Sequence, residues 1–530
     1  MGDDQRENDD VITTYDTDYE AGQDNVEVLG FDVHNPVFFI SGFVVVAFVV
    51  FALLFPQLSA SLFQGLRDRV TADFDWFFVL AGNAFVLFAL FLVISPLGGV
   101  RLGGPDATPD FSRPAWFAML FAAGMGIGLM FFGVFEPVAH FQKPPLNVAP
   151  TETETAKRVA LAATIYHWGL HPWAMYAAAG LAMAFFGYNR QLPLTVRSVF
   201  YPLLGEAVWR WPGHVIDTLA VFATLFGLAT SLGLGAEQAL AGMNYLFGMP
   251  DTNLTKILLI IAITAVATLS VVAGLEAGVK RLSEINMMLA LALLVFLIAA
   301  GPTLELVAGV FRNAVSYVSY LPALSNPIER NPAFLHGWTT FYWAWWISWS
   351  PFVGMFIARV SRGRTVREFV VFVLLVPTLI AIIWMTVFGG TALHQITAEG
   401  YTGVTATVAD WQPELSLFKM LERLPLAGLL SALGVILVLV FFITSCDSGA
   451  LVIDIITAGG KLDPPMMQRV FWAVLVGLVA TALLLGGGLS TLQAAAVATG
   501  FPFAFVLLGM CVCVYLGLYE ELKLSRERRA

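Results

Sequence analysis

Long apolar runs alternate with short polar connections along nearly the whole chain. Each run is about 20 residues long, which is the length an α-helix needs to cross a bilayer. The pattern predicts an all-α polytopic membrane protein with about 12 transmembrane helices. The expected spans lie near residues 36–56, 75–97, 114–140, 157–187, 214–247, 256–276, 283–303, 337–360, 367–391, 425–458, 468–487 and 491–519.

Three segments depart from this pattern. Residues 304–323 carry apolar side chains on one helical face and are expected to form an amphipathic helix on the membrane surface. Residues 1–30 are acidic and poor in apolar side chains, so we expect a disordered N-terminal tail. A twelve-helix domain over 31–520 follows, and 521–530 form a short basic tail.

Composition and charge support the membrane assignment. The 530 residues are 58% hydrophobic and 12% charged, whereas soluble domains carry about 25% charged residues. The acidic N-terminus does not resemble a cleavable signal peptide, and the three cysteines lie in apolar runs, so no disulfide or metal framework is indicated. With the N-terminus inside, 18 of the 28 Lys and Arg residues fall in inner segments, above all in the run 359–367, so we expect both termini in the cytoplasm. We expect the protein in the cell (inner) membrane.

The eighth run contains four tryptophans and a tyrosine within eight residues. On a helical wheel Tyr342, Trp345, Trp346 and Trp349 share one face, and Trp343 points away. Such a face suits a cation that has no hydrogen to donate, for example a quaternary ammonium, because the ring quadrupole attracts positive charge. The alternative is an interfacial aromatic belt, which does not require a shared face.

The third run is interrupted by alternating glycines at Gly124, Gly126 and Gly128. Glycines lower helix propensity, and a break inside an apolar span points to a transporter's binding site. The alternative is close helix packing through small residues. Glu136 lies further along this span and needs a partner there, unless it sits near the end of the helix.

The fourth run offers a second aromatic face, formed by Trp168, Trp173 and Tyr176. His167 and His171 are spaced i, i+4, as two metal ligands can be. No neighbouring Glu or Cys completes such a site, so we favour hydrogen-bonding histidines.

The tenth run places Thr444 and Ser445 beside Asp447. Hydroxyls, carbonyls and a carboxylate suit a hard cation such as Na⁺, although Ser and Thr also bond back to their own helix. The fifth run carries a weaker hydroxyl pair, Thr230 and Ser231.

These strings together resemble the betaine/choline/carnitine transporter family. The resemblance rests on 124–137, 166–173, 342–367 and 444–448, in the family's order, and it covers roughly 30–520. It implies two inverted five-helix repeats, spans 3–7 and 8–12, as in the sodium/amino-acid symporter fold, and a homotrimer. It also implies an aromatic box of Trp168, Trp173, Tyr176 and Trp346 at the glycine break, with Trp349 along the path of the substrate.

The resemblance further implies two sodium sites. The first would use Thr444 and Ser445 with carbonyls near Ala122, Met125, Phe441 and Phe442, and the second would lie near Thr230, Ser231 and Phe352. Choline carriers of the family have Asp where this chain has Gly128, which favours a zwitterion. The long basic C-terminal helix of osmotically regulated members is much reduced here.

The sequence therefore predicts a transporter, not an enzyme, because no nucleophile–base or metal-ligand set appears; a channel is disfavoured because no filter motif does. We expect sodium symport of a zwitterionic quaternary ammonium solute, glycine betaine, in osmoprotection, with Na⁺ as coupling ion and no other cofactor. Alternatives are a proton-coupled carrier, or a substrate/product exchanger for choline, carnitine or a sulfonium analogue such as dimethylsulfoniopropionate. Ectoine also remains possible as a substrate.

Overall fold

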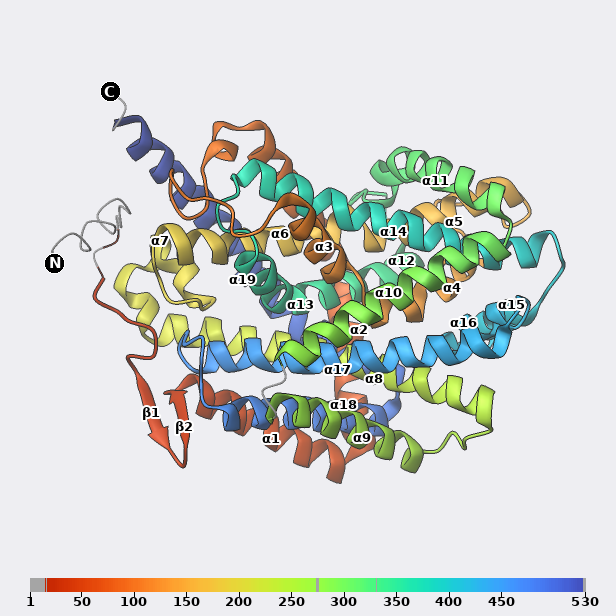
Figure 1. The fold of residues 1–530 in the computed structure, drawn as a ribbon, viewed down its shortest axis with the longest axis horizontal. Helices are drawn as coiled ribbons and strands as arrows, with labels where there is room; N and C mark the ends of the chain where they lie inside the picture. The colour runs from red at the N-terminus through yellow and green to blue at the C-terminus, as the bar shows by residue number, and fades with distance from the viewer. Residues whose placement is uncertain (1–14, 16, 273–275, 330, 528–530) are drawn as a thin grey trace.

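The computed structural model describes residues 15, 17–272, 276–329 and 331–527, and most of them are helical (Figure 1). Helices α3 and α4 are two halves of the predicted third span, and α5 and α6 are two halves of the fourth. The helices that correspond to predicted spans are α1 (Val37–Leu54), α2 (Pro56–Ile94), α3 (Arg113–Gly124), α4 (Ile127–Gln142), α5 (Thr153–Trp168), α6 (Leu170–Ala184), α8 (Trp211–Phe247), α9 (Asn253–Val272), α10 (Glu276–Ala300), α13 (Thr340–Arg359), α14 (Val366–Thr397), α17 (Ala427–Thr457), α18 (Met466–Gly487) and α19 (Leu489–Glu527).

The remaining helices connect these. They are α7 (Tyr201–Leu204), α11 (Thr303–Leu324), α12 (Pro332–Phe334), α15 (Gly403–Ala409), α16 (Pro413–Leu421) and the one-turn helices η1 (Pro96–Gly99), η2 (Phe185–Asn189), η3 (Arg197–Phe200), η4 (Gly205–Trp209) and η5 (Leu335–Thr339). The long helices run roughly along one axis of the molecule (Figure 1). The hairpin of β1 (Asn25–Val28) and β2 (Phe31–His34) lies near one end of this axis, and α15 and α16 lie at the other.

Within the described part of the chain, nine helices are long and apolar enough to cross a membrane, and the bent pair α3–α4 makes ten. The protein is therefore a multi-pass helical membrane protein. The predicted fourth and eighth spans, α5–α6 and α13, are helical but fall outside this set. For α13 the reason is that its tryptophans and tyrosine lower the mean hydropathy of the helix, because the indole N–H and the phenol O–H are polar groups. The number twelve stays a prediction.

Two helix pairs make the most extensive contacts in the bundle, α13 with α6 and α17 with α8. Helix α14 packs on α4, and α18 packs on α9. The crossing of α6 and α13 is close because glycines face each other there: a Cβ added to Gly354 would lie 2.7 Å from Cβ of Ala179 and 2.9 Å from N of Gly180. Small residues let membrane helices approach in this way.

The predicted amphipathic helix at 304–323 is present as α11. Its apolar side chains Leu304, Phe311, Val315 and Val318 form an exposed row at helical spacing. The opposite face, which includes buried Tyr317, packs against α5 and α14. This exposed apolar face on a helix outside the spans fits the expected position at a membrane boundary.

The N-terminal segment differs from the expected disordered tail where the structure describes it, at residues 15 and 17–30. A hairpin pairs β1 (Asn25–Val28) with β2 (Phe31–His34). Tyr19 stacks on Trp209 with ring centroids 4.1 Å apart, and burial together with the Arg197 charge lowers the pKa of His34 to about 3. A few aromatic and polar anchors thus order a segment whose composition alone predicts disorder. Residues 1–14 lie outside the described part.

The C-terminal end also differs in detail from the expected domain boundary. Helix α19 runs without a break from Leu489 to Glu527, so the described part of the predicted tail at 521–530 continues the last helix. Its carboxylate Glu521 contacts the buried guanidinium of Arg190. The helix is therefore anchored beyond its apolar part.

The close crossing of α6 and α13 gives a stability prediction. Gly354→Ala forces a methyl group against Ala179 and Gly180, and overpacking of this kind costs about 1–3 kcal/mol. We expect a lower midpoint of thermal unfolding in detergent. Gly65→Ala in α2 is the control, because its new Cβ would meet no described atom within 4 Å; its midpoint should hold or rise. Equal midpoints for both variants would contradict this packing.

Candidate functional site

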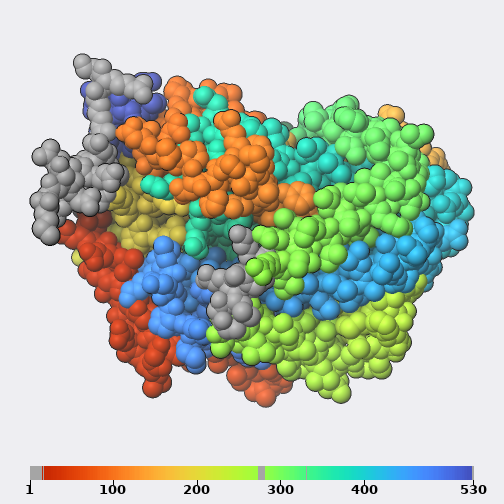
Figure 2. Space-filling model, viewed as in Figure 1, coloured from red at the N-terminus to blue at the C-terminus, as the bar shows by residue number. Residues whose placement is uncertain are grey.

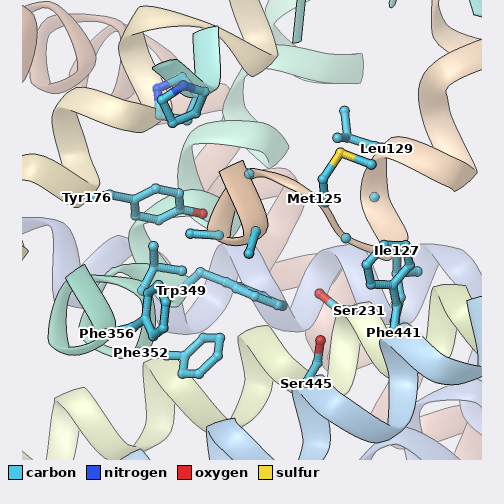
Figure 3. Close-up of a pocket in the computed structure, with 18 of the residues that line it drawn as sticks. Met125, Ile127, Leu129, Tyr176, Ser231, Trp349, Phe352, Phe356, Phe441 and Ser445 are labelled. Atoms are coloured by element: carbon cyan, nitrogen blue, oxygen red, sulfur yellow. The ribbon is translucent and has the colours of Figure 1, made fainter. Parts of the chain in front are cut away.

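A central cavity of about 220 Å³ lies at the break between α3 and α4 (Figure 3). Helices α5, α6, α8, α10, α13, α14 and α17 complete its wall. All eight predicted substrate residues line it, namely Trp168, Trp173, Tyr176, Trp346, Trp349, Gly124, Gly126 and Gly128. Segments distant in the sequence are thus brought to one place.

The break itself exposes backbone to the cavity. Helix α3 ends at Gly124 and α4 starts at Ile127, with an angle of 62° between them. Met125 and Gly126 between them are extended, with φ −93° and −173°. A Cβ at Gly126 would meet no described atom within 4 Å, so this position faces open space. The predicted interruption of the third span is confirmed.

Gly128 plays a different part from the one that the resemblance suggests. A Cβ there would lie 2.6 Å from the ring of Trp168 and 3.0 Å from that of Trp345. The glycine allows these two rings to pack on the first turn of α4. An Asp at this position would collide with Trp168 before it could offer a counter-charge, so the geometry favours the packing interpretation.

The four rings of the predicted box form a continuous chain of contacts. Ring centroids of Trp168 and Trp346 are 4.9 Å apart, and their planes are inclined by 73°. Tyr176 lies 6.3 Å from Trp346 and 5.2 Å from Trp173, again edge to face. Because the rings meet at steep angles, they surround a space on several sides. Figure 3 shows the Tyr176 hydroxyl directed toward the middle of the cavity.

The indole N–H groups of Trp168, Trp346 and Trp349 are paired with acceptors behind the cavity wall. Trp346 donates to the His167 carbonyl at 2.8 Å, and Trp349 donates to the Gly227 carbonyl at 2.9 Å. Trp168 donates to a carboxylate oxygen of Glu136 at 2.8 Å. With their donors already paired, these residues present π faces and edges to the cavity, as cation binding requires.

Glu136 is the hub of a buried hydrogen-bond network behind the box. Its Oε2 accepts from Trp168 and, at 2.5 Å, from the Tyr342 hydroxyl. Its Oε1 accepts from His167 Nδ1 at 2.6 Å and from His140 Nε2 at 3.2 Å. The sequence indicates that Glu136 needs a partner, but most of these partners lie far away along the chain and could not be identified from it.

The histidine pair of the fourth span forms hydrogen bonds, as we favoured. His171 bonds through Nε2 to Asn83 at 3.0 Å, whereas His167 bonds to Glu136 and, through Nε2, to Thr339 at 3.0 Å. The ligand atoms of Glu136, His140 and His167 lie within 4.8 Å of one another. Their hydrogen bonds to each other account for this proximity.

Five of the residues predicted for the first cation site line the cavity. Ala122 and Met125 at the end of α3 and Phe441, Thr444 and Ser445 of α17 all line the cavity. Phe442, whose carbonyl was also predicted, is a fully buried residue outside this lining. The Thr444 hydroxyl donates to the Val440 carbonyl at 3.0 Å, which leaves its oxygen lone pairs available.

The predicted second site is only partly assembled. Ser231 and Phe352 line the cavity. The Thr230 hydroxyl instead donates to the carbonyls of Phe226 at 2.9 Å and Leu492 at 3.0 Å, where it joins α8 to α19. Consecutive residues on a helix point about 100° apart. The Thr230 and Ser231 side chains therefore face different neighbours, and only Ser231 reaches the cavity.

Several lining residues were missed by the sequence analysis. They come from α10, α14 and the second halves of α13 and α17: Ser283, Met287, Val353, Phe356, Pro377, Ala381 and Ser448. Pro377 interrupts an apolar span and was a usable signal of the kind that identified the third span. The others carry no such signal.

Aromatic rings close the cavity on the side away from Phe352 and Phe356. Tyr342 stacks against Trp346 at 5.9 Å and against Trp338 at 6.4 Å. Trp338 lies 5.9 Å from Trp411, which is partly exposed. The cavity therefore extends from the box toward the end of α13 that carries Arg359, and it is sealed toward Trp411.

Comparison with known proteins agrees with this geometry. Residues 36–523 match the betaine/carnitine/choline transporter family. A glycine betaine/proline/choline transporter of Vibrio parahaemolyticus is 55% identical, over 97% of this chain and 96% of its own length. A glycine betaine transporter of the same organism is 52% identical, over 95% of this chain and 97% of its own length. A glycine betaine transporter of Bacillus subtilis is 41% identical, over 92% and 95%. The chain belongs to the betaine/carnitine/choline family of transporters.

Proposed function

We propose that this protein is a sodium-coupled symporter of a zwitterionic quaternary ammonium solute, glycine betaine. One observation carries the proposal: Trp168, Trp173, Tyr176 and Trp346 surround a cavity at a helix break. The names of the similar Vibrio and Bacillus transporters all include glycine betaine, which supports this solute class.

The two ends of such a solute find different partners in the cavity. The trimethylammonium group has no hydrogen to donate, so ring faces can hold it where hydrogen-bond acceptors cannot. The carboxylate needs donors, and the start of α4 supplies backbone N–H groups and the positive end of a helix next to Gly126. A choline cation has no carboxylate to pair with these donors, so we propose a preference for the zwitterion.

The proposed coupling to sodium is supported by the positions at which sodium and the solute would bind. The oxygens of Thr444 and Ser445 and the carbonyls of Ala122 and Met125 form a set suited to a hard cation. Met125 belongs to the same break that lines the solute cavity. A cation that fixes this break in one geometry also fixes the solute site, and such coupling must be reciprocal.

Helix packing supports the proposed inverted repeats, spans 3–7 and 8–12. In these repeats α13 corresponds to α4, and α14 corresponds to α6. The contact of α13 with α6 therefore has a counterpart in the contact of α4 with α14, and both contacts are extensive. The contact of α13 with α19 would correspond to one of α4 with α10, which is far smaller. With both termini proposed in the cytoplasm, the end of α13 that carries Arg359, toward which the cavity extends, faces inward. A homotrimer, the inner membrane and an osmoprotective role are further proposals from the family resemblance.

A proton-coupled carrier is the second candidate, because Glu136 is a fully buried carboxylate beside two histidines. Uptake of labelled betaine into proteoliposomes, with sodium and proton gradients imposed separately, distinguishes the two. Equal uptake after replacement of sodium by potassium, at matched pH, would exclude sodium symport. Exchange that needs internal solute and no ion gradient would indicate an exchanger instead.

Replacement of Trp346 by Leu tests the aromatic box. The change keeps apolar bulk and removes an indole that should contribute about 2 kcal/mol to binding a desolvated cation, so betaine affinity should fall roughly thirtyfold. Tryptophan-fluorescence titration of the folded variant measures this. Trp211→Leu, on an exposed side chain outside the cavity, is the control. Unchanged affinity in Trp346→Leu would remove Trp346 from the site.

Replacement of Thr444 by Val tests the first cation site. Loss of one hydroxyl ligand should raise the sodium concentration for half-maximal uptake about tenfold, or roughly 1.4 kcal/mol. Thr499→Val is a matched control, because Thr499 donates to Ala495 at the same 3.0 Å that separates Thr444 from Val440, but in α19. If both variants shift the sodium dependence equally, the effect comes from the helix and not from a cation site.

Replacement of Glu136 by Gln tests whether the carboxylate orients the box. Gln has one acceptor oxygen for a set of donors that now share two, and an unpaired buried donor costs about 1–3 kcal/mol. We expect betaine affinity to fall about tenfold. In a Trp168→Phe background, which lacks the indole donor, the further loss should be smaller. Glu305→Gln, which loses a bond to His394 outside the cavity, should leave affinity unchanged. Additive losses would show that Glu136 does not act through Trp168.

A further inference from the structure

A second, open cavity of about 640 Å³ lies at the end of the bundle that carries Arg359. Two connections form it, the α2–α3 loop and the α13–α14 loop. They lie side by side in orange and teal at the upper edge of Figure 2 and are joined by a bridge between Arg101 and Thr365. Four arginines line the cavity: Arg101, Arg113, Arg364 and Arg367.

Backbone carbonyls hold two of these arginines in place. Arg101 donates to the Gly363 carbonyl at 2.7 Å. Arg367 donates to the carbonyls of Val93 at 2.6 Å and Ser95 at 3.0 Å. Carbonyl groups satisfy hydrogen bonds but carry no net charge. The guanidinium groups are therefore positioned without being neutralised.

A single carboxylate, Glu368, lines the cavity with the four arginines. Arg113 reaches it at 2.9 Å and Arg364 at 3.1 Å. The nearby Asp110 is paired with a fifth arginine, Arg362, at 3.4 Å. The described lining thus holds an excess of positive charge beside a membrane span.

This positive charge is not confined to side chains in contact with solvent, because Arg364 is buried. Its residue is 3% exposed, and its Nε has no hydrogen-bond partner among the described residues. Its Nη2 donates to the Phe111 carbonyl at 2.6 Å, and the face of Trp116 lies 4.7 Å from the guanidinium carbon. A buried guanidinium with an unpaired donor is costly unless an anion completes it. Fork-shaped arginine donors match phosphate oxygens well.

The remaining wall of the cavity is apolar and leads along the outside of α14. Val371 and Phe372 line the cavity. Leu375 and Leu379 continue this row one and two turns further, 55% and 54% exposed. A charged cavity that runs into an exposed apolar helix face fits an amphiphile better than a free ion.

We propose that this cavity binds the phosphate of an anionic phospholipid, with an acyl chain along Phe372, Leu375 and Leu379 of α14. The phosphate accepts hydrogen bonds from Arg113 and Arg364, and Arg101 and Arg367 add positive charge at its rim. Inorganic phosphate shares the headgroup chemistry but has nothing to place on α14. The site is separate from the solute cavity, and its occupancy does not depend on the transport activity proposed above.

Native mass spectrometry of the full-length protein in detergent tests this proposal. The protein is titrated separately with phosphatidylglycerol, phosphatidylcholine and inorganic phosphate. We expect saturable retention of phosphatidylglycerol in preference to phosphatidylcholine. Arg113→Gln and Arg367→Gln should each weaken it about fivefold, the effect of one basic residue at an anionic membrane surface. Thermal unfolding of each variant is measured alongside, so that a loss of fold is not read as a loss of lipid.

The control is Arg423→Gln. Arg423 is also exposed and also has one carboxylate partner, Glu399 at 3.3 Å, but it precedes α17 in a different connection. Unchanged lipid retention in this variant supports the site. Equal weakening in all three variants, or equal retention of the two lipids, overturns it. Displacement of phosphatidylglycerol by an equal concentration of inorganic phosphate overturns the assignment to a lipid.

Discussion

A buried indole N–H is costly unless it finds an acceptor, and the pairing of three such groups shapes the central cavity. Trp168, Trp346 and Trp349 can keep their faces open to a ligand because their N–H groups are paired elsewhere. Glu136 and the carbonyls of His167 and Gly227 accept them. Loss of one acceptor would free a ring to turn its N–H toward the cavity. The polar network behind the wall is therefore as necessary as the rings.

The second requirement is a helix that stops and restarts in mid-membrane. The break after Gly124 frees backbone groups that a continuous helix would use internally. It also brings Ala122 and Met125 toward α17 while Gly126 faces the solute cavity. One irregular turn thus contributes to both of the proposed ligand sites. A straight third span could contribute side chains to these sites, but no free backbone.

Periodicity carried most of what the sequence could predict. The shared face of Tyr342, Trp345, Trp346 and Trp349, the opposite direction of Trp343 and the break at the glycines need only helix geometry. Trp343 indeed packs on Tyr166 and His171. Periodicity could not predict contacts between segments that are distant in the chain. The clash that makes Gly128 a packing residue depends on where Trp168 stands. The direction of Thr230 depends on a carbonyl of α19.

The N-terminal hairpin was missed for a related reason. A prediction from composition uses only the residues of the segment itself. Tyr19 and Asn25 are held in place by Trp209 and the Ala458 carbonyl, which are distant in the chain. The family resemblance supplied the box and the cation ligands but not the Glu136 network or the arginine cavity. Residues that act through a neighbour leave little trace in a single sequence.

The row of aromatic rings along η5 and α13 has a kinetic consequence. Trp338, Tyr342, Trp346, Trp349 and Phe352 follow one another at intervals of three or four residues, from the sealed side of the cavity to its open side. An ammonium group that moves along this helix exchanges one ring for the next and is never left without a π face. Its dehydration penalty is then incurred once at each mouth rather than at every step. The profile between the mouths becomes a series of shallow wells, which favours rapid passage over tight retention.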